Sequence, residues 1–177
     1  MYSTVLDPRH PMDKQLLRTR ILAQLQIVHQ GAVNAAQRAY DTATNDENVA
    51  ENKYDTLALE ASYLAHGQSQ RVAECLADIQ AFTALDFQTD QTTGHVVLGS
   101  LIQLIDEEDH DRWIFFGPSA GGMKIKMTCD QTQQDTEVVI ITPTSPLGEE
   151  LLNRQVDDEV EITIAGKKIA YDIAVIA

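Results

Sequence analysis

Two long helical patterns follow one another in the first half of the chain, and they constrain the fold more than any other feature. Both have apolar or small residues at spacings of three and four, and no proline interrupts either of them. The first pattern comprises Leu17, Ile21, Leu25, Val28, Ala32, Ala35, Ala39 and Thr42. The second comprises Ala50, Tyr54, Leu57, Ala61, Leu64, Gln68, Val72, Cys75, Ile79 and Phe82. Because a few polar residues join the two patterns, we predict an antiparallel α-helical coiled-coil hairpin.

The residues along the predicted seam change in size from one end of the hairpin to the other. Large aliphatic side chains stand near the base, and alanines stand towards the turn, where small residues let two helices approach closely. Roughly thirty residues with a rise of ~1.5 Å each give a rod about 45 Å long. An ordinary helical domain is the alternative, but the sequence shows no third amphipathic helix of comparable length to complete a bundle.

The turn between the two patterns, Thr44 to Asp55, is rich in carboxylates. They belong to Asp46, Glu47, Glu51 and Asp55. Thr44-x-x-Glu47 and Asn48-x-x-Glu51 each fit a capping box, in which the glutamate accepts a hydrogen bond from the backbone N–H of the cap. One box explains one glutamate but not all the carboxylates, because Glu51 and Asp55 lie one helical turn apart and repel each other. We therefore treat this turn as a candidate site at the tip of the hairpin.

After Phe87 the composition changes from helical to strand-like. A polar linker at residues 88–94 is followed by short runs rich in β-branched and aromatic residues, with turn residues between them. Between the fourth and fifth runs, Ser145 is a suitable N-cap and Pro146 suits the first position of a short helix. The runs are Val96–Ile105, Trp113–Phe116, Met123–Met127, Val138–Thr142, Val160–Ile164 and Ile169–Ile176. We therefore predict an α+β protein: a hairpin domain at residues 1–87, with its acidic tip at 44–55, and an antiparallel β-sheet domain with one short helix at residues 88–177.

The charge balance limits the possible partners. Thirteen Lys and Arg residues against twenty-seven Asp and Glu residues give a formal net charge of −14, which disfavours independent, sequence-specific DNA binding. Arg18, Arg20, Arg38 and Arg71 are sparse, so we expect surface salt bridges from them rather than an RNA-binding patch. The two cysteines and five histidines show no metal-ligand spacing. No apolar run reaches the roughly twenty residues of a membrane span, and we expect a cytoplasmic protein.

Two stretches of the sequence resemble the bacterial Gre transcript cleavage factors. The run ITPTSPLGEELLNRQVDDEVEI, Ile141 to Ile162, is similar to their C-terminal FKBP-like domain, and AENKYDT, Ala50 to Thr56, is similar to part of their N-terminal coiled coil. Asn153, Arg154 and Asp157 depart from the family pattern. The resemblance implies a transcription elongation factor that docks on RNA polymerase through the FKBP-like domain and inserts the coiled coil into the secondary channel. Such a protein is an accessory factor of another enzyme's active site, not an enzyme itself.

The resemblance also gives the acidic turn a chemical role. Cleavage of an RNA phosphodiester in the polymerase uses two Mg²⁺ ions, and carboxylates at the tip would supply oxygen ligands to the second ion. On this interpretation Asp46, Glu47 and Glu51 are the catalytic and Mg²⁺-binding residues, and the isolated protein holds no cofactor tightly. The family pattern is Asp-x-x-Glu-Asn, and both possible registers, starting at Thr44 or at Asn48, replace the aspartate by a neutral residue. A secondary-channel inhibitor or competitor that does not promote cleavage is therefore the alternative.

The start of the short helix is the expected contact with RNA polymerase. Ser145, Pro146 and Leu147 stand at a loop, and we expect the side chain of Leu147 to be an exposed apolar anchor there. Nascent RNA would be contacted only indirectly, and no contact with a membrane is expected. A third interpretation is an interaction module for another partner, with the hairpin as the recognition surface.

Overall fold

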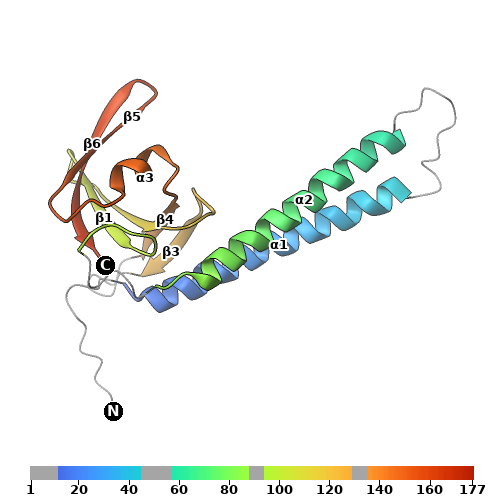
Figure 1. Cartoon of the computed structure of the whole chain (residues 1–177), viewed down its shortest axis with the longest axis horizontal. Helices are drawn as coiled ribbons and strands as arrows, with labels where there is room; N and C mark the ends of the chain where they lie inside the picture. Colours follow the sequence, from blue (N-terminus) through green and yellow to red (C-terminus); the bar gives the residue numbers. More distant parts are fainter. Residues whose placement is uncertain (1–11, 45–56, 88–93, 129–134) are drawn as a thin grey trace, which may run out of the picture. The chain divides into compact units, whose positions relative to one another are not determined.

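The structure, a computed structural model, describes residues 12–44, 57–87, 94–128 and 135–177. Two long helices precede a β-sheet that also carries one short helix (Figure 1). The elements are α1 (Lys14–Thr44), α2 (Leu57–Ala84), β1 (Leu101–Asp106), β2 (Asp111–Phe116), β3 (Lys124–Thr128), β4 (Asp135–Ile141), α3 (Pro146–Leu151), β5 (Glu159–Ile164) and β6 (Lys167–Ile176). The α+β class predicted from the sequence is confirmed. None of the described helices is long and apolar enough to cross a membrane.

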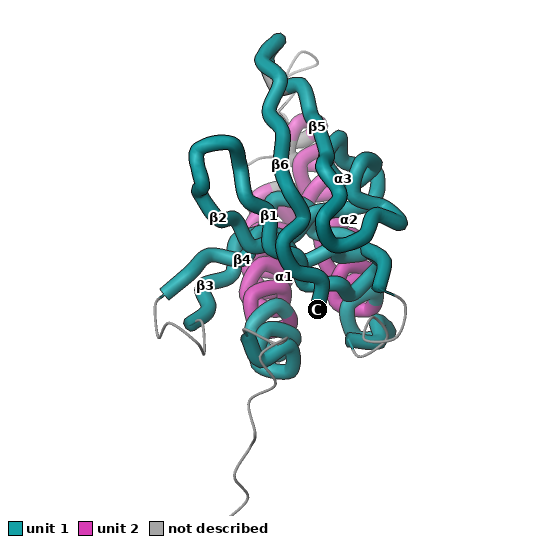
Figure 2. The backbone as a smooth tube through the Cα atoms, turned by 90° about the vertical axis from the view of Figure 1, so that its left-hand side faces the viewer, with its two compact units in different colours: residues 1–21, 81–177 teal, residues 22–80 magenta. Residues whose placement is uncertain are grey.

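The chain forms two compact units, and the division falls inside both long helices (Figure 2). Unit 1 is Met1–Ile21 together with Ala81–Ala177, and unit 2 is Leu22–Gln80. The sequence places a boundary at residues 87 and 88, whereas the contacts assign the beginning of α1 and the end of α2 to the unit that contains the sheet. The reason lies in the packing within unit 1, where these helix ends cover part of the sheet.

The sheet of unit 1 has the strand order β3-β4-β2-β1-β6-β5. Neighbouring strands run antiparallel, with one exception: β2 and β4 are parallel, from Trp113 opposite Val138 to Phe116 opposite Ile141. The parallel pair arises because β3 lies at the edge of the sheet and β4 returns between β3 and β2. The predicted antiparallel sheet with one short helix is thus confirmed in its main features, and the parallel pair is a difference.

All the strands predicted from the sequence are present, but the first begins later than expected. Val97 to Ser100 form a turn rather than part of a strand, since Ser100 N–H donates to the Val97 carbonyl at 3.0 Å and Val97 N–H donates to Ser100 Oγ at 3.0 Å. Gly99 has φ +98°, and a Cβ there would lie 2.9 Å from the carbonyl oxygen of Asp86. The turn therefore requires glycine, and β1 starts only at Leu101.

The main core of unit 1 lies between one face of the sheet and α3. Leu147 and Leu151 of α3 pack there against strand residues that alternate along each strand. The buried residues of this core are Val96, Ile102, Leu104, Ile114, Phe116, Leu147, Leu151, Val160, Ile162, Tyr171 and Ile173. Because every second residue of a strand points into this core, the strands appear in the sequence as short patterns of apolar residues.

Aromatic side chains of unit 1 join the end of α2 to the sheet. Phe115 follows Ile114 along β2 and points to the other face, where its ring centroid lies 6.2 Å from that of Phe82 and 5.0 Å from that of Phe87. Phe82 and Phe115 are fully buried, and Phe87 is 3% exposed. Large rings in such contacts bury much apolar surface, which fixes the end of α2 within unit 1.

The hairpin of unit 2 has a seam of small residues. On α1 the side chains of Leu25, Ala32 and Ala39 are buried, as the periodicity predicts. On α2, Leu64 is 56% exposed, so its predicted place in the seam is wrong, and half-buried Ala65 takes that position. With Ala65 included, the α2 seam keeps an unbroken three-four alternation; its members are Ala65, Gln68, Val72, Cys75, Ile79 and Phe82. Thr42 is exposed and bonds the carbonyl of Arg38 instead of joining the seam.

Candidate functional site

The acidic turn lies outside the described residues. Asp46, Glu47 and Glu51 belong to residues 45–56, which separate the end of α1 from the beginning of α2. Their role as catalytic and Mg²⁺-binding residues therefore stays a prediction, and so do the two capping boxes. In sequence, these residues connect the parts of α1 and α2 that belong to unit 2.

The second predicted site, at the start of α3, is fully described, and its local structure follows from the motif Ser-Pro-Leu-Gly. Ser145 Oγ accepts a hydrogen bond from Gly148 N–H at 3.1 Å and donates one to the Thr142 carbonyl at 2.8 Å. Pro146 occupies the first helical turn, where its missing N–H costs nothing. The predicted N-cap is confirmed, and it satisfies an N–H that the helix itself leaves without a partner.

Gly148 is required by a close approach of two backbone segments. A Cβ at this position would lie 1.9 Å from the carbonyl oxygen of Thr142, far inside van der Waals contact. The glycine thus lets the first turn of α3 pack directly against the end of β4. The Ser-Pro-Leu-Gly motif is explained to a large extent by the fold, without any partner.

Leu147 is not the exposed anchor that the sequence suggested. Its side chain is 7% exposed and belongs to the main core, together with Leu151 one helical turn later. The expected exposure is wrong because Leu147 and Leu151 lie on the face of the short helix α3 that packs against the sheet. Pro146, in contrast, is exposed, and Ser145 is half-buried.

Three other aliphatic side chains of unit 1, on the segment after α3 and on the segment bonded to it, are exposed, and we name them the apolar patch. Leu152 directly follows α3 and is 44% exposed, Val156 is 43% exposed, and Leu98 is 41% exposed. Two hydrogen bonds join the chain segments that carry them: Val96 N–H donates to the Arg154 carbonyl at 2.8 Å, and Asn153 N–H donates to the Val96 carbonyl at 3.0 Å. The patch therefore lies on two adjoining segments.

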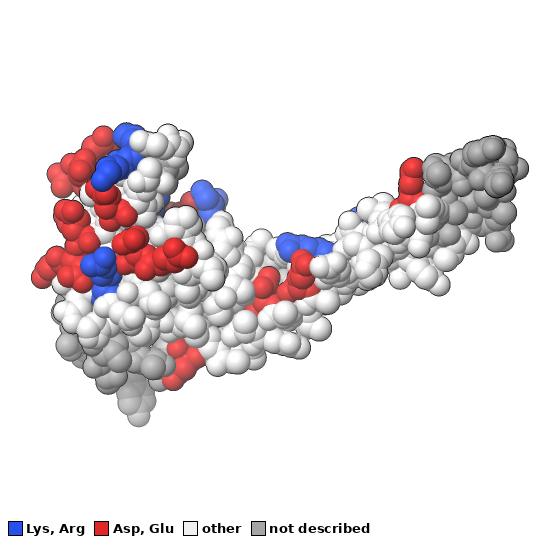
Figure 3. Space-filling model, turned by 45° about the horizontal axis from the view of Figure 1, so that its top comes forward, with Lys and Arg blue, Asp and Glu red and all other residues white. Residues whose placement is uncertain are grey.

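Acidic side chains accompany the apolar patch along the chain. Glu149 and Glu150 precede Leu152, and a further acidic run, Asp157 to Glu159, follows Val156. Arg154 lies between them, and its guanidinium is 3.4 Å from the carboxylate of Glu150. Acidic side chains also gather on the face of this unit that Figure 3 shows, with a few basic ones among them. The apolar patch thus has acidic residues beside it along the chain.

Basic residues at the beginning of α1 anchor it within unit 1, a role that the sequence did not reveal. The Arg18 guanidinium lies 5.6 Å from the ring centroid of Phe87 and donates to the carbonyl of Thr83 at 3.1 Å, in the last turn of α2. Arg20 donates to the carbonyl of Lys126 in β3. Surface salt bridges were expected from Arg18, Arg20, Arg38 and Arg71. Among the described residues, only Arg71 of these four has one, with Glu74 at 3.4 Å. No pattern marks backbone carbonyls as acceptors, so these contacts have no sequence signal.

The pKa values of two surface side chains of unit 1, Asp106 and Lys168, are shifted from their ordinary values. The backbone N–H of His110 donates to Asp106 Oδ1 at 2.9 Å and is the main cause that lowers the pKa of Asp106. The carboxylate of Glu161, 2.7 Å from Lys168 Nζ, raises the pKa of Lys168. Both causes are local, one within a turn and one within a strand pair, so neither shift indicates a proton-transfer site.

Comparison with known proteins identifies the C-terminal segment. Residues 128–177 match the family described as the C-terminal domain of the transcription elongation factors GreA/GreB. This match confirms the predicted resemblance to the GreA/GreB transcription elongation factors, and it covers residues 128–177 of the chain. The match includes β4, β5, β6 and α3, and hence the helix start and most of the apolar patch.

Three solved structures with similar chains are bacterial Gre-type factors. The GreA factor homolog 1 (Gfh1) of Thermus thermophilus is 18% identical, with 88% of this chain and 94% of that chain covered and a TM-score of 0.35. Gfh1 of Thermus aquaticus is 18% identical over 92% and 93%, with a TM-score of 0.37. A GreA/GreB factor from Nitrosomonas europaea is 16% identical over 67% and 92%, with a TM-score of 0.35. TM-scores of this size show no common arrangement of whole chains, so the assignment rests on the family match. No curated protein matches the chain.

Proposed function

We propose that this protein is an accessory factor of RNA polymerase that acts through its helical hairpin and promotes transcript cleavage in backtracked elongation complexes. The observation that carries the proposal is the GreA/GreB match of residues 128–177 in a chain that also contains a long two-helix hairpin. On this proposal the sheet-containing unit binds the polymerase, and the hairpin enters the secondary channel. The protein itself is not an enzyme, since the reacting bond lies in the polymerase.

The dimensions of the hairpin support insertion into a channel. Helix α1 has 31 residues, which at ~1.5 Å per residue gives a length of about 46 Å. The seam contains Ala32 and Ala39 on α1 and Ala65 on α2, and small residues permit close packing of the two helices. Such a long and slim pair of helices suits a narrow channel.

The acidic turn supplies the chemistry in this proposal. A polymerase active site that hydrolyses RNA uses a pair of divalent ions, and the second ion needs oxygen ligands. The carboxylates of Asp46, Glu47 and Glu51 would provide these ligands, with Mg²⁺ shared between the factor and the polymerase. Nascent RNA is then contacted only through the metal site. The neutral residues at the family's aspartate position favour the alternative, an inhibitor that occupies the channel without cleavage.

The apolar patch replaces Leu147 as the proposed polymerase contact. Leu98, Leu152 and Val156 are each more than 40% exposed, and exposed Pro146 begins the helix that ends just before Leu152. An apolar centre with a charged rim is typical of protein-binding surfaces. The acidic residues beside the patch in sequence favour a polymerase surface that bears lysine or arginine side chains.

Binding measurements with RNA polymerase test the proposed contact. We expect Leu152→Asp and Val156→Asp to weaken binding at least tenfold while the melting temperature stays unchanged, because both side chains are exposed. Leu16→Asp is the matched control, since Leu16 is 42% exposed on α1, away from the patch in sequence. Equal binding by the patch variants and the unmodified protein would remove the patch from the interface, and absence of binding by the unmodified protein would overturn the proposed function.

A further inference from the structure

We propose a divalent transition-metal site at the turn between β1 and β2, formed by Asp106, Glu108 and His110. A carboxylate oxygen of Asp106, one of Glu108 and a ring nitrogen of His110 all lie within 4.8 Å of one another. The site belongs to unit 1 and shares no residue with the acidic turn or with the apolar patch. It goes beyond the proposed function and does not depend on RNA polymerase.

The imidazole of His110 lies close to both carboxylates. Nδ1 of His110 is 3.3 Å from Oδ2 of Asp106 and 3.6 Å from Oε2 of Glu108. A metal ion about 2.1 Å from each ligand places neighbouring ligand atoms about 3.0 Å apart in octahedral geometry and about 3.4 Å apart in tetrahedral geometry. The two separations from Nδ1 are close to these values, and the carboxylate oxygens of Asp106 and Glu108 lie within 4.8 Å of each other, so an ion can bind after modest movements of exposed side chains.

The backbone of the turn holds the first ligand in place. Oδ1 of Asp106 accepts hydrogen bonds from the N–H groups of Glu108 and His110, each at 2.9 Å. These bonds occupy Oδ1 and direct Oδ2 towards the imidazole. Asp106 N–H donates to the His110 carbonyl at 3.1 Å, which closes the turn and brings the ligands from positions 106, 108 and 110 to one side. Such preorganisation reduces the conformational entropy lost on binding.

The ligand set selects the class of metal. One imidazole nitrogen with two carboxylates suits Zn²⁺, Co²⁺, Ni²⁺ or Mn²⁺, whereas Mg²⁺ prefers oxygen ligands only. The histidine therefore separates this site from an ordinary acidic surface cluster. Glu108 and His110 are largely exposed, which leaves the remaining coordination positions open to water or to a ligand from a partner.

Calorimetric titration of the full-length protein with Zn²⁺ and with Mg²⁺ tests the site. We expect saturable Zn²⁺ binding that His110→Ala and Asp106→Asn each weaken at least tenfold, with no comparable binding of Mg²⁺. His66→Ala is the matched control, because His66 is an exposed histidine on α2. A second control replaces Asp46, Glu47 and Glu51 by their amides, and this variant should bind Zn²⁺ as the unmodified protein does.

Paramagnetic NMR gives an independent readout. Co²⁺ should broaden or shift the ring protons of His110 and the amides of residues 106–110 before those of any other histidine. Absence of saturable binding at millimolar Zn²⁺, unchanged affinity in His110→Ala, or an effect centred on another histidine would each overturn the site. The outcome is separate from polymerase binding, so failure here leaves the proposed function standing, and the reverse also holds.

Discussion

The two compact units differ in how they are packed. Unit 1 buries large side chains completely, among them Phe82, Phe115 and Phe116, on both faces of its sheet. Among the described residues of unit 2, the buried apolar side chains are Leu25, Ala32, Ala39 and Cys75. The difference shows that unit 1 is built for stability, because apolar burial is the main favourable term in folding, whereas the hairpin is built to be slim.

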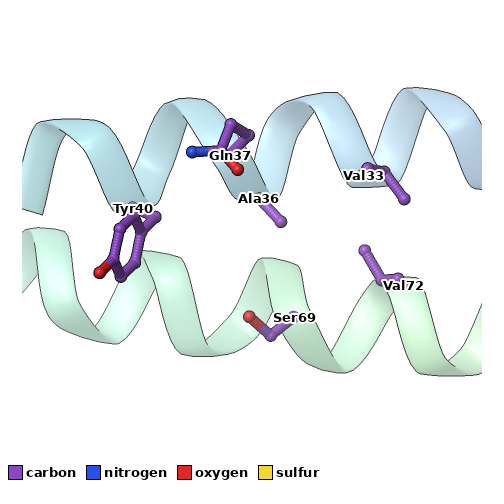
Figure 4. Close-up of a pocket in the computed structure, with 6 residues that line it drawn as sticks. All are labelled: Val33, Ala36, Gln37, Tyr40, Ser69 and Val72. Atoms are coloured by element: carbon purple, nitrogen blue, oxygen red, sulfur yellow. The ribbon is translucent and has the colours of Figure 1, made fainter.

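The hairpin also has an open groove beside its seam. A cavity of about 330 Å³ is lined by side chains of both helices, Val33, Ala36, Gln37, Tyr40, Ser69 and Val72 (Figure 4). Tyr40 remains 59% exposed there. Residues in such a groove lack neighbours on one side, so truncating them should cost less than truncating residues of the unit 1 core.

The largest effect is expected from placing a charge in the core of unit 1. Leu147→Asp buries a carboxylate among apolar side chains, which costs several kcal/mol and should unfold unit 1. Circular dichroism during thermal unfolding would show the loss of the cooperative transition at physiological temperature. A variant with an unchanged melting temperature would mean that Leu147 is exposed after all and that the contrast between α3 and the apolar patch is wrong.

A pair of truncations compares the two units directly. Phe82→Ala in unit 1 should lower the free energy of unfolding by about 3–5 kcal/mol, because a fully buried ring is lost. Val72→Ala in unit 2 should lower it by only about 1 kcal/mol, because Val72 lines an open groove. Urea unfolding of both variants measures these values. Equal losses would show that the hairpin is packed as tightly as the sheet.

Loss of the α3 cap should have an intermediate effect. Ser145→Ala removes the acceptor for Gly148 N–H and should cost about 1 kcal/mol. Ser69→Ala on α2 is the control, since Ser69 is exposed and its hydroxyl bonds only the Ala65 carbonyl within the same helix. If both substitutions have the same effect in urea unfolding, the cap contributes nothing specific.

The smallest effect is expected in the opposite direction, from two helical glycines of unit 2. Nothing lies within 4 Å of a Cβ built at Gly31 or at Gly67, so neither is required by packing. Alanine at either position should raise the free energy of unfolding by up to about 1 kcal/mol, because glycine loses more backbone entropy in a helix. A decrease in the melting temperature would indicate that the glycines serve a packing role.

Much of the fold was predictable from the sequence because its elements repeat a pattern. The seam of α1 and the β strands each span enough residues to show a period. Leu64 was misplaced because Ala65 stands next to it, and size alone favours the leucine. Leu147 was misplaced because α3 has six residues, too few to show a periodic face. The parallel pairing of β2 and β4 has no signal in either strand, and it depends on the position of β3.

Transcript length in backtracked elongation complexes tests the proposed cleavage activity. We expect the purified protein to shorten the RNA in the presence of Mg²⁺. We also expect amide substitutions at Asp46, Glu47 and Glu51 to abolish this shortening while polymerase binding is retained, because ligand charge is lost and the hairpin is unchanged. Absence of shortening at any Mg²⁺ concentration, with elongation slowed in proportion to the bound fraction, would instead identify an inhibitor of the polymerase.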